Sequence, residues 1–352
     1  SWGSYYDDPA NKLHADMMGF DVEQDASGGE HWFMGTDGGL YTSTDGVENV
    51  QNLSLTGLRV GQYYSTLTSL EGNLAAGAQD QGYQLSVNQD MEGDFYNLNQ
   101  ILSGDYGHLS SGDGNHNFVF STYPGFILVQ VGENNPSLKY LDFPAQESNA
   151  WLPPVVADPD TPSDFYFLAS HLYRYNYAQR QWNSELWSQQ NFGLRQGEYL
   201  TALAFSPLDH ERAWAATNYG RMFWSEDHGV TWEKSDDTGP GAHYFYGTAL
   251  IASHLNKNLV YVGGSGYDGP AVYRSEDGGQ TWEEFGEGLP YTLVYGLAES
   301  LDGTGMLAAG TETGAWIRPP ESSAWEEVTA PITTYWSVEA LPTENTFRFG
   351  TY

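Results

Sequence analysis

The chain has 352 residues, of which 46 are acidic and 13 basic, so its formal net charge at pH 7 is −33. This excess of negative charge disfavours nucleic acid and anionic membranes as partners, because like charges repel. There is no cysteine, which excludes disulfides and thiolate chemistry, and no apolar run long enough for membrane insertion as a helix. Aromatic residues make up 15% of the chain, which also holds 41 glycines, a composition typical of many short strands and turns.

A step of small residues that ends an apolar run recurs along the chain. It is found at residues 35–37, 77–79, 169–171, 216–218, 263–265, 310–312 and 350–352. The steps lie 40 to 47 residues apart, except for one interval of about twice that length, which residues 120–122 divide. A period in the forties with short strands favours a β-propeller in which each repeat forms one blade.

Each repeat is expected to supply four antiparallel strands. In the fifth repeat, residues 200–205 would form the innermost strand and residues 212–217 the second. The inner-strand pairs place the blades near residues 12–56, 57–100, 101–146, 150–191, 196–237, 243–287, 291–329, and 335–352 together with 1–11. Residues 1–352 therefore read as a single all-β propeller domain.

The last repeat has only an inner pair, at residues 335–341 and 346–351. Residues 2–6 could add an outer strand to it, which would protect an exposed sheet edge. This arrangement favours eight blades with a shared or incomplete last blade, and seven blades are the alternative. The unfinished repeat also indicates that the chain is an excerpt of a longer protein with flanking domains.

Two octapeptides of the form Ser-x-Asp-x-Gly-x-Thr-Trp begin at Ser225 and Ser275. The aspartate can accept backbone N–H bonds across a tight turn, the glycine can take a positive φ, and the tryptophan can cover the edge of a blade. We therefore expect a structural role for these residues. They are Ser225, Asp227, Gly229, Trp232, Ser275, Asp277, Gly279 and Trp282.

This octapeptide resembles the Asp-box, or BNR, repeat of sialidases, sortilin-type receptors, xyloglucanase-like glycosidases and many secreted bacterial proteins. In that family the box forms the turn between the two outer strands of a propeller blade. The resemblance implies a secreted or cell-surface β-propeller. A sialidase is not expected, because the first arginine is Arg59 and no Arg-Ile-Pro motif lies near the start of the chain.

The loops that enter each innermost strand and leave each second strand should lie on one face of a propeller. On this face we expect a ligand to contact His14, Tyr64, Gln79, His108, Tyr199, Asn218, Tyr219, His243, Tyr244, Tyr246, Tyr295 and Trp336. Aromatic rings present apolar faces to sugar C–H groups, and amide and imidazole groups bond hydroxyls, so this set suits a neutral glycan or a peptide. The alternative is that the aromatic side chains only pack the channel.

Four aspartates in the N-terminal part of the same loops are candidate catalytic residues. The segment Thr36-Asp37-Gly-Gly-Leu-Tyr41 resembles the segment of xyloglucanase-type propellers that supplies a catalytic aspartate, which implies that role for Asp37. In those enzymes the second acid comes from another propeller. Here Asp16, Asp80 or Asp105 would have to pair with Asp37, and an inverting mechanism needs about 6.5–9.5 Å between the carboxyl groups. The alternative is that these acids cap turns or bind a cation.

Two hypotheses follow from the sequence. The favoured one is a secreted or cell-surface binding module, part of an adhesin or larger secreted protein, that holds a polysaccharide or a protein ligand. The alternative is an extracellular glycoside hydrolase that acts on a polysaccharide, so whether the chain is an enzyme stays open. No cofactor is required, Ca²⁺ suits so acidic a surface, and the sequence assigns no metal site.

Overall fold

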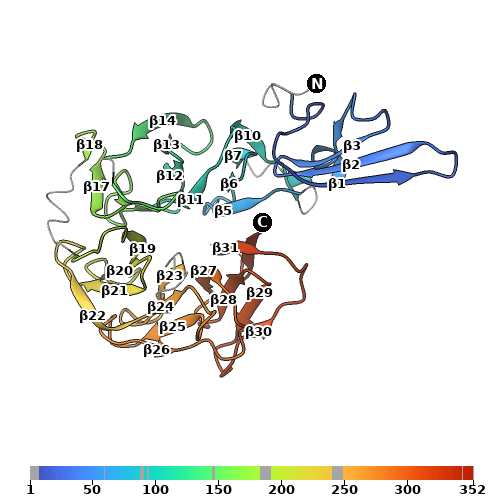
Figure 1. The fold of residues 1–352 in the computed structure, drawn as a ribbon. Coiled ribbons are helices and arrows are strands. Elements are labelled where there is room, and N and C mark those ends of the chain that lie inside the picture. Colours follow the sequence, from blue (N-terminus) through green and yellow to red (C-terminus); the bar gives the residue numbers. More distant parts are fainter. Residues whose placement is uncertain are drawn as a thin grey trace.

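The computed structural model describes residues 8–58, 60–87, 91–92, 95–144, 147–182, 192–239, 249–342 and 344–351. Seven four-stranded antiparallel sheets, one two-stranded sheet and a small hairpin follow one another along these residues. The molecule is a β-propeller, as the repeat period predicts (Figure 1). No helix in this described part is long and apolar enough to cross a membrane.

The first four sheets pair their strands as follows. The first contains β1 (Met17–Gln24), β2 (Glu30–Thr36), β3 (Gly39–Ser43) and β4 (Gln51–Asn52). After a short π-helix, η2 (Ser54–Leu58), the second contains β5 (Tyr63–Thr68), β6 (Leu74–Ala78), β7 (Gly82–Ser86) and β10 (Asn99–Leu102), with the hairpin of β8 (Met91–Glu92) and β9 (Phe95–Tyr96) between its last two strands. The third contains β11 (Gly107–Ser110), β12 (Phe118–Tyr123), β13 (Phe126–Val131) and β14 (Ser137–Asp142). The fourth contains β15 (Val155–Ala157), β16 (Phe165–Leu168), β17 (Leu172–Asn176) and β18 (Gln181–Trp182).

The remaining sheets repeat the same order. The fifth contains β19 (Leu200–Phe205), β20 (Ala213–Thr217), β21 (Arg221–Ser225) and β22 (Glu233–Thr238). The sixth contains β23 (Ala249–Ala252), β24 (Val260–Gly263), β25 (Val272–Ser275) and β26 (Glu283–Glu284). The seventh contains β27 (Val294–Glu299), β28 (Leu307–Thr311), β29 (Ala315–Arg318) and β30 (Glu326–Glu327), and the two-stranded sheet contains β31 (Tyr335–Ala340) and β32 (Phe347–Thr351).

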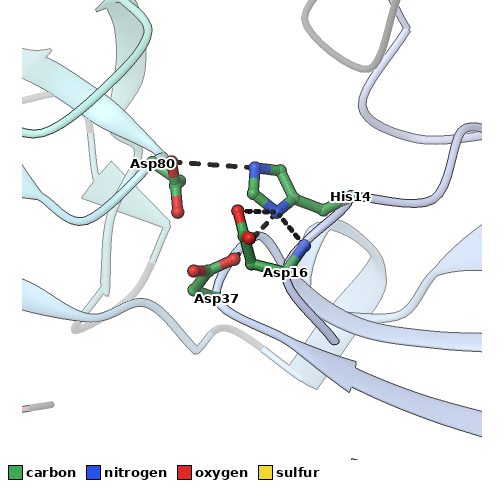
Figure 2. A group of neighbouring side chains, drawn as sticks. All are labelled: His14, Asp16, Asp37 and Asp80. Atoms are coloured by element: carbon green, nitrogen blue, oxygen red, sulfur yellow. Dashed lines mark hydrogen bonds and ion pairs between the residues drawn. The ribbon is translucent and has the colours of Figure 1, made fainter. Parts of the chain in front are cut away.

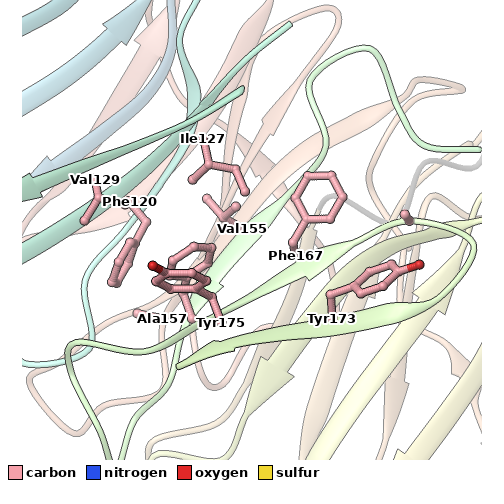
Figure 3. Close-up of a cluster of buried hydrophobic side chains, with 10 residues drawn as sticks. Phe120, Ile127, Val129, Val155, Ala157, Phe167, Tyr173 and Tyr175 are labelled. Carbon is pink, nitrogen blue, oxygen red and sulfur yellow. The ribbon is translucent and has the colours of Figure 1, made fainter. Parts of the chain in front are cut away.

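The hydrophobic core lies between the faces of neighbouring sheets. Between the third and fourth sheets, the rings of Phe120 and Phe165 lie 4.5 Å apart, and Ile127 and Val155 are buried in the same cluster (Figure 3). Aromatic pairs of this kind stabilise a face-to-face packing beyond the area that they bury. Sheets of the ring therefore share their core with a neighbour, whereas Leu13, Met34, Tyr41 and Val50 form a separate cluster within the first repeat.

The recurrent step of small residues marks the points where neighbouring sheets approach most closely. A Cβ atom added to Gly77 at the end of β6 would lie 2.3 Å from the Tyr106 carbonyl oxygen, just before β11. A Cβ atom on Gly310 in β28 would lie 2.6 Å from the Tyr335 carbonyl oxygen at the start of β31. Only glycine fits at such distances, so these two positions of the recurrent step require glycine.

The close contacts of a third glycine, Gly350, show how the ring closes. A Cβ atom on Gly350 in β32 would lie 2.9 Å from the Tyr63 carbonyl oxygen, so the two-stranded sheet packs against the second sheet. At this seam the partly buried Glu339 accepts hydrogen bonds at 3.2 Å from the Thr66 and Thr68 hydroxyl groups, and from the Thr68 backbone N–H. The inner strands β5, β11, β15, β19, β23, β27 and β31 thus surround one central channel.

The first sheet lies beside this ring, where Figure 1 shows β1 to β3 projecting away from it. All of β1 is exposed, including Met18 and Phe20, and Gly35 has only the neighbouring strand's Gly19 within 4 Å of an added Cβ atom. The sequence did not predict this placement, because the first sheet carries the same repeat as the sheets of the ring. Residues 2–6, predicted as an outer strand of the last blade, lie outside the described residues.

The two octapeptides form the turns between the third and fourth strands of the fifth and sixth sheets. In the first turn, Asp227 accepts hydrogen bonds from the Thr231 backbone N–H at 2.8 Å and from the Ser225 hydroxyl at 2.9 Å. Gly229 has a φ of 77°, and the Trp232 indole is buried against the core. The second turn repeats these contacts with Ser275, Asp277, Gly279, Thr281 and Trp282.

Candidate ligand-binding channel and acidic cluster

The inner strands enclose a cavity of about 710 Å³ along the axis of the ring. All seven inner strands contribute to its wall, each with residues at or near the start of the strand. A cavity of this volume lies within the range of roughly 300–1,000 Å³ that is usual for small-ligand sites. The axis of the ring is therefore a site large enough for a ligand of a few sugar or amino-acid residues.

Aromatic side chains gather at the end of the cavity where the inner strands begin. Trp336 is stacked on Tyr295 with ring centroids 4.8 Å apart and an interplanar angle of 10°. Tyr64 meets Trp336 edge-on at 5.1 Å and Trp151 edge-on at 6.1 Å. Trp151 is 59% exposed, so one large aromatic surface faces solvent at this opening. Tyr199 also lines the cavity.

The rest of the lining is uncharged. Among the described residues that form the wall there is no Asp, Glu, Lys or Arg. Burial lowers the pKa of His108 to about 4, so this imidazole is neutral at pH 7. The Ser337 hydroxyl is buried and has no hydrogen-bond partner in the described structure. The channel thus offers aromatic surface and neutral polar groups.

A second site lies where the first sheet contacts the second (Figure 2). His14 precedes β1, Asp37 lies in the turn between β2 and β3, and Asp80 lies in the turn between β6 and β7. His14 Nδ1 is 2.8 Å from Asp37 Oδ1 and 3.7 Å from Asp16 Oδ2, and His14 Nε2 is 3.7 Å from Asp80 Oδ1. The Gln79 amide donates to Asp37 Oδ2 at 3.3 Å. The loop before β1, the turn between β2 and β3 and the turn between β6 and β7 thus meet at His14.

The aspartates of this cluster disfavour one another's charge. Burial and the nearby carboxylate of Asp37 raise the pKa of Asp80 to about 7, with further contributions from Asp105 and Asp16. Burial also raises the pKa of Asp105, whose Oδ1 accepts the Asp80 backbone N–H at 3.3 Å. His14, Asp16, Asp37 and Asp80 each offer one ligand atom within 4.8 Å of the others, so these four residues could hold a metal ion.

The structure divides the residues singled out from the sequence between these two sites. Tyr64, His108, Tyr199, Tyr295 and Trp336 line the channel. His14 and Gln79 lie instead in the acidic cluster, together with Asp16, Asp37, Asp80 and Asp105.

Other residues singled out from the sequence lie away from both sites. Asn218 does not line the cavity, and its side-chain oxygen accepts the Tyr199 backbone N–H at 3.0 Å. Tyr219 follows it and is 38% exposed. His243, Tyr244 and Tyr246 lie outside the described residues.

Sequence reasoning missed Trp151. This residue lies in the loop that enters β15, on the face where the other aromatic residues were collected. The fourth repeat is expected to begin near residue 150, so Trp151 occupies the same loop position in its repeat as Tyr199 and Tyr295 do in theirs. Its omission left out the most exposed aromatic side chain of the channel lining.

No protein-family model and no curated protein matches the chain. Among solved structures, it is similar to the extracellular domain of BT4673 from B. thetaiotaomicron, with a TM-score of 0.59, 15% identity, and coverage of 84% of this chain and 38% of that one. It is equally similar to the Niastella koreensis GH74 enzyme, with a TM-score of 0.59, 10% identity, and coverage of 85% and 42%. The chain thus spans about two-fifths of the length of these two proteins.

A third similar structure is the β-propeller domain of Cps50 (Swd1) from Myceliophteria thermophila, with a TM-score of 0.59 and 12% identity. The match covers 83% of this chain and 94% of that domain. At such low identities these similarities establish the β-propeller fold.

Proposed function

We propose that the protein is an extracellular binding module that holds a neutral polysaccharide at the aromatic opening of its central channel. The observation that carries this proposal is the cavity of about 710 Å³, whose described lining has aromatic side chains at one end and no charged residue. A site of this composition binds by surface contact and hydrogen bonds. Its described lining contains no pair of carboxyl groups that could act as acid and base in hydrolysis.

The arrangement of the aromatic rings supports a sugar ligand. Trp336 and Tyr295 are stacked on each other, while the exposed Trp151 presents a ring to solvent beside Tyr64. A flat ring binds the C–H face of a pyranose, and the unpartnered Ser337 hydroxyl and the neutral His108 can bond its hydroxyl groups. Repeating sugar units would occupy the channel opening and continue outward over Trp151.

The charge of the molecule supports a neutral ligand over an acidic one. The net charge of −33 repels polyanions, and the described channel lining supplies no lysine or arginine to counter that repulsion. An acidic polysaccharide would therefore enter against the field of the whole protein. This argument favours neutral glycans over uronate-rich ones.

An extracellular location is part of the proposal. It is supported by the similarity to the extracellular domain of BT4673 and by the resemblance of the Ser-x-Asp-x-Gly-x-Thr-Trp turns to those of secreted proteins. Because the chain spans about two-fifths of that neighbour, other parts of a longer protein would carry any signalling or adhesive role.

A glycoside hydrolase is the second candidate, since the raised pKa of Asp80 beside Asp37 is of the kind that general acids need. The similarity to the GH74 enzyme of Niastella koreensis points the same way. However, one carboxylate oxygen from each of Asp16, Asp37 and Asp80 lies within 4.8 Å of the others, which leaves little room between them for the attacking water of an inverting mechanism. These carboxylates also stand apart from the aromatic channel, so binding is the better supported function.

The test is a panel of neutral and acidic polysaccharides, scored for retention and for release of reducing ends. We expect wild-type protein to retain a neutral polysaccharide without releasing reducing ends. Trp336→Ala and Trp151→Ala should weaken retention at least about fivefold, because truncation of an aromatic anchor costs about 1–3 kcal/mol of binding free energy. Tyr140→Ala removes an aromatic ring that is also 54% exposed but lies on the outer strand β14, so it is the matched control.

Release of reducing ends that disappears in Asp37→Asn would favour the hydrolase instead. Retention that falls equally in Tyr140→Ala and in Trp336→Ala would contradict binding at the channel opening.

A further inference from the structure

The acidic cluster has the geometry of a coordination site. The loop before β1 supplies His14 and Asp16, the turn after β2 supplies Asp37, and the turn after β6 supplies Asp80. One ligand atom of each lies within 4.8 Å of those of the other three (Figure 2). In six-coordinate geometry with bonds of about 2.1 Å, opposite ligands are about 4.2 Å apart, so a cation could bind after the side chains move closer by about half an ångström.

Asp37 gives a second observation that points to a ligand. Its side chain is 6% exposed, and its Oδ1 accepts no hydrogen bond within the described structure. The nearest nitrogen, His14 Nδ1, lies 2.8 Å away without forming a hydrogen bond to this oxygen. A cation bound here would give Asp37 Oδ1 the partner that it lacks among the described residues.

The charges of the cluster also call for a cation. Three carboxylates surround one imidazole, and Asp105 adds a fourth nearby. In the described part of the chain, no lysine or arginine forms an ion pair with any of them. Buried carboxylates without a positive partner are costly, and a divalent ion supplies the missing charge at one point.

We propose that His14, Asp16, Asp37 and Asp80 bind one divalent cation of the Mn²⁺ or Zn²⁺ type. Carboxylates alone would suit Ca²⁺ or Mg²⁺, but the imidazole nitrogen shifts the preference to the transition series. Asp16 is 67% exposed, which gives the ion a path of entry and leaves room for a water ligand. The site is separate from the aromatic channel, and the inference does not rest on the proposed function.

Such an ion would fasten the first sheet to the ring. Three of its four ligands belong to the first sheet and its leading loop, while Asp80 belongs to the second sheet. The first sheet lies beside the ring, and in the described residues its turn at Asp37 and Gly38 is joined to the second sheet by long hydrogen bonds from Gln79 at 3.3 Å and Gln81 at 3.5 Å. Coordination of one cation by Asp80 and by the three ligands of the first sheet would therefore fix the angle between the first sheet and the ring.

The experiment titrates the full chain, freed of metal with a chelator, separately with Mn²⁺, Zn²⁺, Ca²⁺ and Mg²⁺ in a calorimeter. We expect one equivalent of Mn²⁺ or Zn²⁺ to bind more tightly than Ca²⁺ or Mg²⁺. Asp37→Asn and Asp80→Asn should each weaken this binding by more than about 100-fold, since loss of outer-shell partners alone costs about 10- to 100-fold. Asp268→Asn, which removes one exposed carboxylate elsewhere, should leave it unchanged.

Three results would overturn the proposal. They are the absence of one-to-one uptake of Mn²⁺ and Zn²⁺, equal affinity in wild type and Asp80→Asn, and a loss in Asp268→Asn as large as that in Asp80→Asn. Should Asp37→Asn fail to give a native circular dichroism spectrum, Asp80→Asn decides, because removing a charge from a crowded cluster does not threaten folding. Tighter binding of Ca²⁺ than of Mn²⁺ and Zn²⁺ would overturn the assigned class of ion.

Discussion

The protein contains two kinds of aspartate, and their surroundings are opposite. In the octapeptide turns, burial alone would raise the pKa of Asp277, but bonds from the Thr281 side chain and backbone and from Ser275 lower it. In the acidic cluster, burial and other carboxylates raise the pKa of Asp80 to about 7. The first carboxylate is surrounded by donors and the second by acceptors.

This difference in hydrogen bonding distinguishes structural aspartates from candidate ligand-binding aspartates more clearly than their sequence motifs do. A carboxylate whose oxygens are filled by hydrogen bonds from its own turn has nothing left to offer a ligand. A carboxylate held among other acids either takes up a proton and loses its charge, or keeps its charge beside a cation. The Asp-Gly sequences at Asp45 and Asp37 look alike, yet Asp45 accepts bonds from Asn49 and Ser43, whereas Asp37 Oδ1 accepts none in the described structure.

The largest effect should be the loss of stability in acid, and Asp158 is the residue to follow. This fully buried carboxylate would have a raised pKa from burial alone, but bonds from His228 and Thr161 and the charge of Arg174 hold its pKa at about 2. Because the folded pKa lies below the usual 3.8, its contribution is complete above pH 4 and is lost as the pH falls towards 2. Urea unfolding should show a loss of about 2 kcal/mol over that range, and a smaller slope in Asp158→Asn.

A flat stability profile between pH 4 and pH 2 in the wild type would contradict this account. The alanine variant of the exposed Glu284 is the control, since the profile of Glu284→Ala should follow that of the wild type.

The next effect concerns the octapeptide turn itself. Asp277→Ala removes the acceptor for the Thr281 N–H and for the Ser275 and Thr281 hydroxyl groups. Loss of a comparable capping side chain costs about 1 kcal/mol, so thermal unfolding should occur a few degrees lower. Glu276→Ala, at the neighbouring exposed position, should change it much less. Equal shifts in the two variants would mean that the turn aspartate does not stabilise the blade.

The smallest effect should have the opposite sign. In protein freed of metal, Asp80→Asn removes a charge that Asp37 and Asp105 repel, so the variant should be more stable than the wild type at pH 8, by about 1 kcal/mol. Urea denaturation with and without a chelator measures this. If Asp80→Asn is instead less stable than the wild type in the metal-free state, Asp80 stabilises its turn as the aspartates of the octapeptide turns do.

The strands could be predicted because their signals are local. The inner strand expected at residues 200–205 is β19, and the pair expected at residues 335–341 and 346–351 forms β31 and β32. The fourth strand of the second sheet, β10, ends at Leu102, beyond the limit expected at residue 100, because the hairpin of β8 and β9 lengthens that repeat. Alternating apolar residues and glycine steps sufficed for element positions.

The closure of the ring could not be predicted in the same way. It depends on which sheet lies next to the two-stranded one, and that is decided by contacts between residues far apart, such as Glu339 with Thr68. The acidic cluster shows an intermediate case. Its members were selected from their loops, but their contact with His14 depends on how the first sheet sits beside the second.

The seam between Glu339 and Thr68 has a consequence for synthesis of the chain. Its two sides are 271 positions apart, so the second sheet emerges from the ribosome long before its final neighbour exists. At about 5–20 residues per second, the interval is roughly 15–55 s. Throughout that time the edge of β5 that will meet β31 has no permanent cover, and the nascent protein is an open arc of sheets that becomes a ring only when its last strands are made.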